Sequence, residues 1–431
     1  MKVLHIASGD FFSTYGGGQV YVKNIVDTMI DMGIDLSVVS TTDTAGPITK
    51  NYRGSTLVEI PGGISDEQLL NVVEGLKPNV IHAHSLKDRV CRVGRKLGIP
   101  VVVTAHHGGI LCPAGTRLDC ADNICSRKIS HQDCLPCVMR NIPGAKWLWY
   151  PMMKHLPEKN YDALGRWLSS KPFIPFITPV GSSSQYIKKK QKQWHDITEG
   201  CTRMIAPCKE IADAMIANGL AAHKVSVIPH GIPMPAQRPA FPAIIDGKIK
   251  FYYVGRICYV KGIHILLEAF HSVDAPGIEL HLIGGAGNKH EVRYMSDLQK
   301  RYFPDKRIIW HGKIAPEAIY DATRNYHVSS SSAFLEAFGL NIAEALALGK
   351  PVLATRSGGS EQQIKDGVNG WLVPSNDTDA LATKIRHIIA HADELPDISA
   401  NCQAIPIRTH CEELLKTYHS VKNQQTAESN L

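Results

Sequence analysis

Long apolar stretches are missing from this sequence of 431 residues. No run of 18 or more apolar residues occurs, which excludes a membrane-spanning helix and leaves only peripheral contact with a membrane. A charged n-region followed by a long apolar segment is missing too, because Met1–Ile6 is typical of a buried strand, so we expect no signal peptide. We therefore expect a cytoplasmic chain whose 11 cysteines are reduced and form no disulfides.

The sequence also lacks a strong excess of one charge. It has 47 Lys and Arg against 40 Asp and Glu, a net charge of +7. This mild excess suits phosphate-bearing ligands or an anionic membrane surface better than nucleic acid, so we predict no nucleic-acid partner. With 44% hydrophobic residues the chain can bury a large core, and its length favours two domains or more.

In the N-terminal half, short apolar runs alternate with segments of helical period. The strand-like runs include Val3–Ala7, Val80–Ala83 and Pro100–Thr104. The helix-like segments Gln19–Gly33 and Leu86–Leu97 separate them along the chain. This alternation is expected of a parallel sheet with crossover helices, so residues 1–228 are predicted to form a doubly wound α/β domain.

Proline marks the predicted boundary after that domain. Residues 229–248 hold five prolines, which favours an interdomain linker. A second series of strands and helices starts at Ile249–Val254 and predicts another α/β domain over 249–400, with a C-terminal helix and polar tail over 401–431. Two Rossmann-like sheets facing each other across a cleft are the natural outcome.

Glu336 and Glu344 flank a segment that predicts a ligand site. Helix formers run up to a stop at Gly349, so a short helix should begin near Leu340. Its free N–H groups and positive dipole end would bind phosphate oxygens. The two carboxylates would accept hydrogen bonds from neutral hydroxyls on either side of a diphosphate, as in a nucleoside-diphosphate sugar. The alternative is that Glu344 complements the helix dipole and Glu336 is a loop charge.

Two cations follow the first strand of the second domain. Arg256 and Lys261 stand five residues apart in the loop after Ile249–Val254, the place where open α/β sheets bind ligands. A fixed guanidinium and a mobile ammonium at that point could neutralise a leaving diphosphate. Taken alone, the pair would be a solvated face.

These motifs together resemble the retaining glycosyltransferases of family 4, glycosyl transferases of group 1, which have the GT-B fold. The resemblance rests on the two glutamates around Ala-Phe-Gly-Leu and on a set of further motifs that follow in the expected order: Gly16-Gly17-Gly18-Gln19, Ile81-His82-Ala83-His84, Val102–His106, Val227–Ile232, Gly255–Gly262, Ser357–Glu361 and Asp366–Gly370. It covers most of the chain. The fold it implies is two Rossmann-like domains with the nucleotide-sugar site in the C-terminal one.

The resemblance also implies roles for single residues. Arg256 and Lys261 would bind the donor diphosphate, Glu344 the ribose hydroxyls, and Glu336 the hydroxyls of the donor sugar. The backbone amides around Phe338, Gly339, Leu340 and Asn341 would contact sugar and phosphate, and the loop of Gly16, Gly17 and Gly18 would close over the diphosphate, where glycine lets the backbone approach. His106 matches a histidine near the reacting sugar carbon; its alternative is a core histidine at a strand end.

The chemistry follows from electrostatics. Breaking the bond from anomeric carbon to phosphate places negative charge on the diphosphate, so cations and helix N–H groups aimed at it stabilise the transition state, and no cofactor or metal is required. Retention in this family is usually written as same-face attack, with the departing phosphate oxygen taking the acceptor's proton. Asp377-Thr378-Asp379 resembles the metal signature of transferases with another fold, but its place at a helix start favours N-capping.

One cysteine-rich insertion stands apart, over residues 112–137. Cys134 and Cys137 form a C-x-x-C, and with Cys112 and Cys125 they could supply four thiolates for a structural zinc ion or iron–sulfur cluster. Cys120 is the fifth cysteine of the insertion and would be left over. The alternative is that these are plain buried or reduced thiols.

Aromatic and basic residues gather later in the same domain. The run Trp147–Met153 lies near the basic cluster Lys188–Lys192, a combination that suits the inner face of a cell membrane and a lipid-linked acceptor. Core aromatics beside a solvated lysine face are the alternative.

The sequence thus predicts a retaining, metal-independent transferase of hexosyl or N-acetylhexosaminyl groups. Its donor would be a nucleoside-diphosphate sugar, its acceptor a saccharide or a lipid-linked molecule, and its role bacterial polysaccharide, lipopolysaccharide or glycolipid biosynthesis. Three alternatives stay open, one of which is a metal-dependent transferase that would use Asp377 and Asp379 and lose activity in chelator. A sugar-nucleotide epimerase on the same fold would convert donor without acceptor and release no nucleotide, and a non-catalytic nucleotide-sugar-binding protein would release no nucleoside diphosphate with any acceptor.

Overall fold

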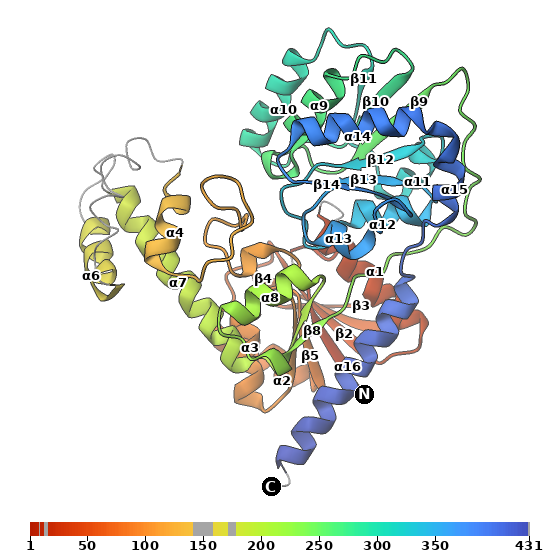
Figure 1. The fold of residues 1–431 in the computed structure, drawn as a ribbon. Coiled ribbons are helices and arrows are strands. Elements are labelled where there is room, and N and C mark those ends of the chain that lie inside the picture. The colour runs from red at the N-terminus through yellow and green to blue at the C-terminus, as the bar shows by residue number, and fades with distance from the viewer. Residues whose placement is uncertain (8, 13–15, 141–157, 171–177, 430–431) are drawn as a thin grey trace. The chain divides into compact units, whose positions relative to one another are not determined.

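The apolar runs of the N-terminal half form the strands of one sheet in the computed structural model of the chain, which describes residues 1–7, 9–12, 16–140, 158–170 and 178–429. The chain divides into two units (Figure 1). Unit 1 comprises Met1–Ile228 and Cys411–Leu431, and unit 2 comprises Pro229–His410. The chain after residue 400 is therefore shared: residues 401–410 belong to unit 2 and the rest to unit 1.

Unit 1 contains an eight-stranded sheet in the order β3-β4-β2-β1-β5-β6-β7-β8. All neighbouring strands pair in parallel except β3 and β4. The strands are β1 Val3–Ile6, β2 Leu36–Thr42, β3 Ile48–Tyr52, β4 Ser55–Pro61, β5 Val80–Ala83, β6 Val101–Thr104, β7 Arg203–Ala206 and β8 Val225–Val227. Because β1, β5 and β6 are buried along their whole length, they read as continuous apolar runs in the sequence.

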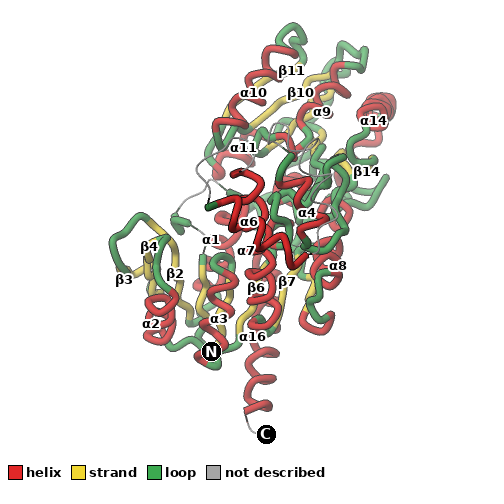
Figure 2. Tube along the Cα trace, turned by 90° about the vertical axis from the view of Figure 1, so that its left-hand side faces the viewer, coloured by secondary structure: helices red, strands yellow, loops and turns green. Residues whose placement is uncertain are grey.

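The helices of unit 1 lie beside this sheet or, in the case of α4 and α6, on α7 (Figure 2). They are α1 Gly17–Asp31, α2 Asp66–Leu76, α3 Lys87–Leu97, α4 His131–Val138, α6 Glu158–Ser169, α7 Thr178–Gly200, α8 Lys209–Ala217 and α16 Ile407–Ser429. The last helix packs on the unit through Tyr418, whose hydroxyl lies 2.6 Å from His82 Nδ1. The sequence predicted a C-terminal helix and polar tail over 401–431, and in the structure α16 continues to Ser429.

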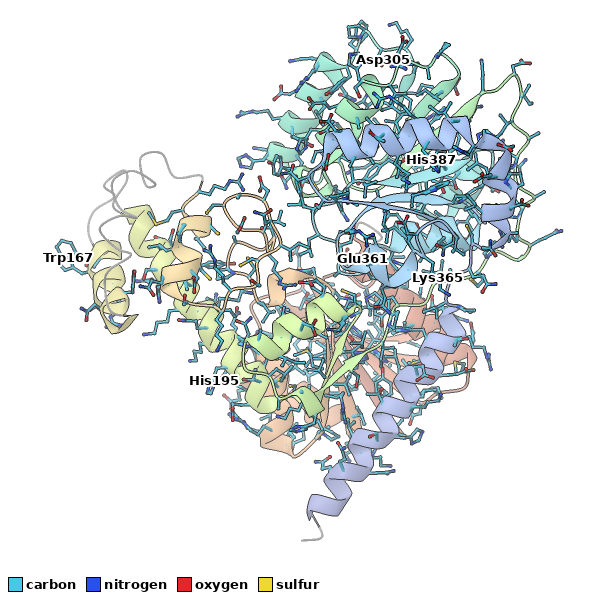
Figure 3. The ribbon with its side chains drawn as sticks, viewed as in Figure 1. Trp167, His195, Asp305, Glu361, Lys365 and His387 are labelled. Atoms are coloured by element: carbon cyan, nitrogen blue, oxygen red, sulfur yellow. The ribbon has the colours of Figure 1, made fainter. Side chains whose placement is uncertain are left out.

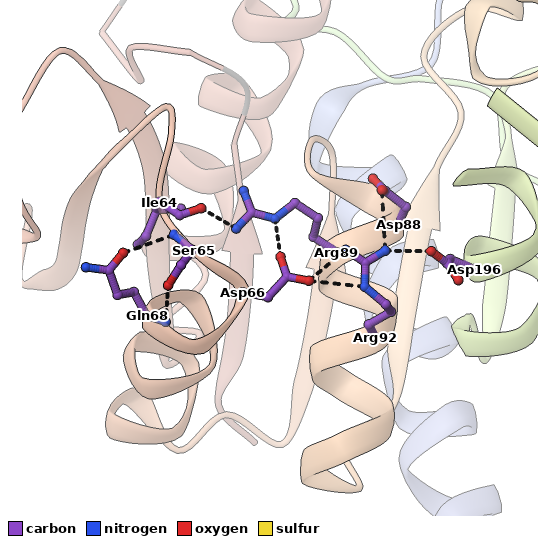
Figure 4. Close-up of polar contacts among 8 residues, drawn as sticks. All are labelled: Ile64, Ser65, Asp66, Gln68, Asp88, Arg89, Arg92 and Asp196. Atoms are coloured by element: carbon purple, nitrogen blue, oxygen red, sulfur yellow. Dashed lines mark hydrogen bonds and ion pairs between the residues drawn. The ribbon is translucent and has the colours of Figure 1, made fainter. Parts of the chain in front are cut away.

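Polar contacts fix α2, α3 and α7 to one another (Figure 4). Ser65 and Gln68 form a capping box at the start of α2, each side chain bonding the other residue's backbone N–H. The Asp66 carboxylate accepts hydrogen bonds from Arg89 and Arg92 of α3 at 2.6 and 2.7 Å. Arg92 also donates to Asp196 of α7 at 2.6 Å, so one aspartate and one arginine link three helices.

Unit 2 contains a six-stranded parallel sheet in the order β11-β10-β9-β12-β13-β14. Its strands are β9 Ile249–Val254, β10 Ile278–Ile283, β11 Ile308–Gly312, β12 Val328–Ser331, β13 Val352–Thr355 and β14 Gly370–Val373. Its helices are α9 Ile263–His271, α10 Lys289–Arg301, α11 Ile319–Thr323, α12 Leu340–Ala347, α13 Gly359–Gln363, α14 Thr378–Ala390 and α15 Leu395–Ala400. Residues of α12 pack with Val352, Ala354 and Leu372 in the core, which fixes the helix against β13 and β14.

Candidate functional site

Loops at the carboxyl ends of β9, β10, β12 and β13 bring the predicted donor residues of unit 2 together. Since these strands are parallel and adjacent, their carboxyl ends lie on one edge of the sheet. Two glycines allow neighbouring loops to approach each other closely, because glycine has no Cβ. A Cβ on Gly284 would lie 1.8 Å from Gly255 O, and one on Gly262 would lie 2.0 Å from Ser332 O. Both have positive φ, 144° and 63°, which glycine adopts readily.

Lys261 and Glu336 form an ion pair in this edge. Lys261 ends a 3₁₀ turn, Tyr259–Lys261, and Ser332 Oγ donates to its carbonyl oxygen at 3.0 Å. Glu336 is 7% exposed, and its backbone is held on both sides, by N–H to Ser357 O at 3.0 Å and by O to Gly359 N–H at 2.8 Å. The predicted cation and the predicted sugar-binding carboxylate therefore neutralise each other.

Arg256 has a partner that the sequence did not indicate. Its guanidinium, which is 56% exposed, lies 3.6 Å from the carboxylate of Glu291 in α10. Glu291 also accepts a hydrogen bond of 2.7 Å from the N–H of Gly287 in the loop after β10. Because an exposed pair of this kind is weak, Arg256 can turn toward an anion at little cost.

The start of α12 is open as predicted. The helix begins at Leu340, and Gly339 before it has φ +86° with no side-chain cap. In the described part of the chain, the N–H groups of Leu340 and Asn341 have no acceptor. The Gln363 side chain donates to the carbonyls of Phe338 and Gly339, which holds the loop in place. Two oriented donors at a helix N-terminus are suited to phosphate oxygens.

Glu344 lies one turn further along α12 and is half-buried. Its carboxylate makes no hydrogen bond or ion pair with any described residue. Burial raises the pKa of Glu344 to about 7. The charge of Glu344 in turn contributes to the raised pKa of Tyr252 and Tyr320, after their own burial. A carboxylate in this position lacks donors, and the hydroxyls of a ligand would supply them.

In unit 1, the predicted glycines and His106 lie together. Gly16 caps α1, and Gly17 and Gly18 are its first residues. A Cβ on Gly18 would lie 3.8 Å from Cγ of His106, which follows β6. His106 Nε2 is 3.1 Å from Nδ1 of the buried His84. His106 therefore lies close both to a core residue and to the glycine turn, and this geometry is compatible with the core role as well as with the role in the site.

The cysteine insertion places its thiols on a small module beside α4. Cys134 and Cys137 project from α4, and Cys120 Sγ lies 3.6 Å from Cys137 Sγ. Burial raises the pKa of Cys134 to about 11 and of Cys137 to about 12. Among the described residues, the side chains whose ligand atoms are gathered closely enough to share an ion are His5, His82 and His84, and Cys112, Cys125, Cys134 and Cys137 form no such group.

The structure describes Asp377 but not the aromatic run Trp147–Met153. The Asp377 side chain caps α14 by accepting from Ala380 N–H at 2.8 Å, which confirms the N-cap interpretation. The run Trp147–Met153 lies outside the described residues. Within the part that is described, no helix has the length and apolar character needed to cross a membrane.

Comparisons with known proteins agree with this arrangement. A family model described as glycosyl transferases group 1 matches residues 237–403, and one described as glycosyltransferase family 4 matches residues 15–119. The chain belongs to the group 1 glycosyltransferases. The resemblance inferred from the motifs is thereby confirmed, and the two parallel-sheet α/β units confirm the predicted fold class.

Relatives and solved structures of this glycosyltransferase type show how far the likeness extends. D-inositol 3-phosphate glycosyltransferase of Xylanimonas cellulosilytica is 26% identical over 239 residues, 52% of this chain and 57% of the relative. Alignments with the curated relatives span 15–57% of those proteins' own length.

HepE of Anabaena, solved with UDP, has a TM-score of 0.67 at 16% identity, covering 97% of this chain and 100% of that one. The lipopolysaccharide outer core galactosyltransferase WaaB has a TM-score of 0.60 at 13% identity, covering 97% of this chain and 99% of that one. At these low identities the structural likeness shows the fold alone, which is GT-B.

Proposed function

We propose that the chain transfers a sugar from a nucleoside-diphosphate donor to a saccharide or lipid-linked acceptor, with retention of anomeric configuration. The observation that supports this most is the edge of unit 2, where the loops at the carboxyl ends of parallel strands carry Arg256, Lys261, Glu336 and the open start of α12. We propose that the cations and the helix start bind the diphosphate and that Glu336 and Glu344 accept hydrogen bonds from sugar hydroxyls. The membership in the group 1 family supports the same reading.

The transition state gives each of these groups a task. As the bond from anomeric carbon to phosphate breaks, negative charge grows on the diphosphate, and Lys261, Arg256 and the N–H groups of Leu340 and Asn341 stabilise it. The departing phosphate oxygen takes the proton of the acceptor hydroxyl on the same face of the sugar. Since two cations already neutralise the leaving group, this proposal needs no metal ion at that point.

The remaining predicted residues are proposed to act on the same donor. Glu336 binds hydroxyls of the sugar and Glu344 those of the ribose. The backbone around Phe338 and Gly339 contributes to the sugar and phosphate contacts, the Gly16–Gly18 turn approaches the diphosphate, and His106 acts near the reacting carbon. Their support is the resemblance together with the local geometry of each unit.

A UDP-sugar carrying a hexose or N-acetylhexosamine is the first donor to test. HepE, which shares the fold, was solved with UDP-glucose. In a thermal-shift screen of UDP-, GDP- and ADP-sugars, we expect one base class to raise the melting temperature by about 5–10 °C, because a ligand at about 100 times its Kd stabilises by about 2.7 kcal/mol.

The donor found in this screen is then incubated with candidate acceptors. Free nucleoside diphosphate released only with acceptor supports transfer, an epimer without nucleotide release supports an epimerase, and absence of both supports a binding protein.

Metal independence can be tested at Asp377. Asp377→Asn keeps the N-cap, because asparagine caps helices as well as aspartate does, but removes a charged metal ligand. We expect this variant to keep its melting temperature and its kcat, and transfer by the wild type to persist in chelator. Loss of activity in chelator that added divalent ions restore, together with an inactive Asp377→Asn, would contradict the proposal.

We propose the pathway and location from a structural neighbour and from exposed residues of α6 and α7. WaaB acts in the lipopolysaccharide outer core, which favours a bacterial surface glycolipid or polysaccharide as the product and a cytoplasmic enzyme that contacts the inner membrane face. Exposed residues of unit 1 support the membrane contact. Trp167 of α6 is 56% exposed and points away from the ribbon (Figure 3), and Lys188 and Lys189 of α7 are exposed. Exposed aromatic and basic residues are of the types that suit anionic lipid.

The thiols of residues 112–137 are proposed as a structural zinc or iron–sulfur site. Cys134 and Cys137 stand three residues apart on one face of α4, and Cys120 joins Cys137 at 3.6 Å, so Cys120 is a candidate ligand beside the predicted Cys112 and Cys125. Metal analysis of the purified protein, repeated on Cys137→Ser, is the measurement: about one equivalent of zinc, or a cluster absorbance, that the variant lacks is expected.

A further inference from the structure

Histidines on three adjacent strands of unit 1 form a chain of ring-to-ring hydrogen bonds. His5 lies on β1, His84 follows β5, and His106 follows β6. His5 Nδ1 is 3.2 Å from His84 Nε2, and His84 Nδ1 is 3.1 Å from His106 Nε2. His84 thus uses both ring nitrogens, one toward the fully buried His5 and one toward the partly exposed His106.

The direction of these bonds follows from burial. Burial lowers the pKa of His5 to about 3 and that of His84 well below its usual value, so both rings are neutral and carry one proton each. His5 Nε2 has no partner in the described part of the chain, and an unpaired buried N–H is rarer than an unpaired acceptor. The His5 proton therefore sits on Nδ1 and is donated to His84 Nε2. His84 then carries its proton on Nδ1 and donates it to His106 Nε2.

A metal ion is the other explanation for clustered histidines, since His5, His82 and His84 could share one. His82, however, already bonds Tyr418 Oη at 2.6 Å and Thr104 Oγ1 at 2.7 Å through its two nitrogens. An ion would have to replace these bonds as well as the His5–His84 bond. The hydrogen bonds already occupy both nitrogens of His82, both nitrogens of His84 and Nδ1 of His5, and leave only Nε2 of His5 for an ion among these three described rings, so the geometry favours the hydrogen-bond chain.

We propose that His84 is a positioning residue, which holds His106 through this hydrogen bond and, with His5 behind it, fixes the proton of His106 on Nδ1. The inference rests on the proposed transferase function, in which His106 acts near the reacting sugar carbon. The ring of Tyr21, 5.3 Å from that of His106 and 6.0 Å from that of His84, packs edge-on against both and limits their rotation. His106 would then carry an N–H group, not a lone pair, at Nδ1.

A matched pair of variants separates this bond from packing. The amide of Asn stands as many bonds from Cβ as His Nδ1, and the amide of Gln as many as His Nε2. His84→Asn therefore keeps a partner for His106, whereas His84→Gln keeps one for His5 alone. We expect His84→Asn to retain kcat within about threefold and His84→Gln to lose about 10- to 100-fold in kcat, with KM for the donor changed less than about threefold in both. Equal losses in the two variants, in step with equal losses in melting temperature, would show that His84 only packs.

The second measurement does not require turnover. Ring ¹⁵N shifts report which nitrogen of His106 carries the proton, and the His106 signals are assigned by their loss in His106→Ala. We expect an Nδ1–H form in the wild type and a mixture in His5→Phe, which removes the far end of the chain. An Nε2–H form in the wild type, an unchanged signal in His5→Phe, or one equivalent of metal lost in His5→Phe would overturn the inference. If the wild type transfers no sugar from any donor, the proposed function fails while the shifts still decide the hydrogen-bond chain.

Discussion

Lys261→Ala is expected to lower kcat by about 10²- to 10³-fold, the loss typical of removing one group that stabilises transition-state charge. The structure gives two reasons to expect a loss of this size. The variant lacks the ammonium that would meet the leaving diphosphate. It also leaves Glu336, which is 7% exposed, without its cation, and removing one member of a buried pair costs more than the pair contributes. A lone carboxylate would then repel the donor phosphates.

This reasoning can be tested with a second substitution and a control. Glu336→Gln added to Lys261→Ala removes the unpaired charge, so the double variant is expected to bind donor no worse than Lys261→Ala although each single variant is impaired. Lys300→Ala removes an exposed cation of α10 in the same unit and should leave kcat and KM as in the wild type. Full activity of Lys261→Ala with the identified donor would contradict the assignment of the diphosphate site.

Parts of the site that depend on contiguous sequence were predictable. The start of α12 at Leu340 followed from helix formers before a glycine stop, and the two cations fell after β9 as predicted. The carboxyl end of a parallel strand is a ligand position in any sheet of this type, so the location needed only the strand order.

Contacts between distant segments were not predictable. Glu291 meets Arg256 across 35 residues, and nothing in its own helix marks it as a counterion. The Lys261–Glu336 pair joins residues that were assigned to phosphate and to sugar, and their mutual neutralisation depends on the close approach of Gly262 to Ser332. The His5–His84–His106 chain likewise depends on strands that are neighbours in space and not in sequence.

The sequence did not reveal β3, β4, β7, β12 and β14, and two of these strands lack an apolar run. β3 is an exposed edge strand of sequence ITKNY, and β12 is a buried strand of sequence VSSS. Serines of β12 are buried because the strand lies between β9 and β13, where the ladder satisfies its backbone. In both cases the position of the strand in the sheet decides whether it is buried, and the periodicity of the sequence does not encode that position.

Glu344→Gln is expected to stabilise the ligand-free protein and to weaken donor binding. The pKa of Glu344 is raised by burial from 4.5 to about 7, so the folded state binds more protons than the unfolded state between these values. The free energy of unfolding therefore falls as pH rises across this window, by about 3 kcal/mol in total. A neutral glutamine avoids most of this cost. At pH 8 we expect the variant to melt about 4–8 °C higher than the wild type, and at pH 4.5 the two should melt together.

Glu344→Gln should bind donor more weakly although it is more stable. The ribose hydroxyls donate stronger hydrogen bonds to an ionised carboxylate than to a neutral group. Binding then lowers the pKa of Glu344 and releases a proton near pH 7, so donor affinity of the wild type falls as pH drops below about 7. Calorimetry in buffers of different ionisation enthalpy measures that proton, and Glu344→Gln should lack both the release and the pH slope while binding about 10- to 100-fold more weakly. Glu268→Gln, at an exposed position on α9, is the matched control and should change neither melting nor binding. A variant that gains stability at pH 8 but keeps full donor affinity would show that the buried charge serves something other than the ribose.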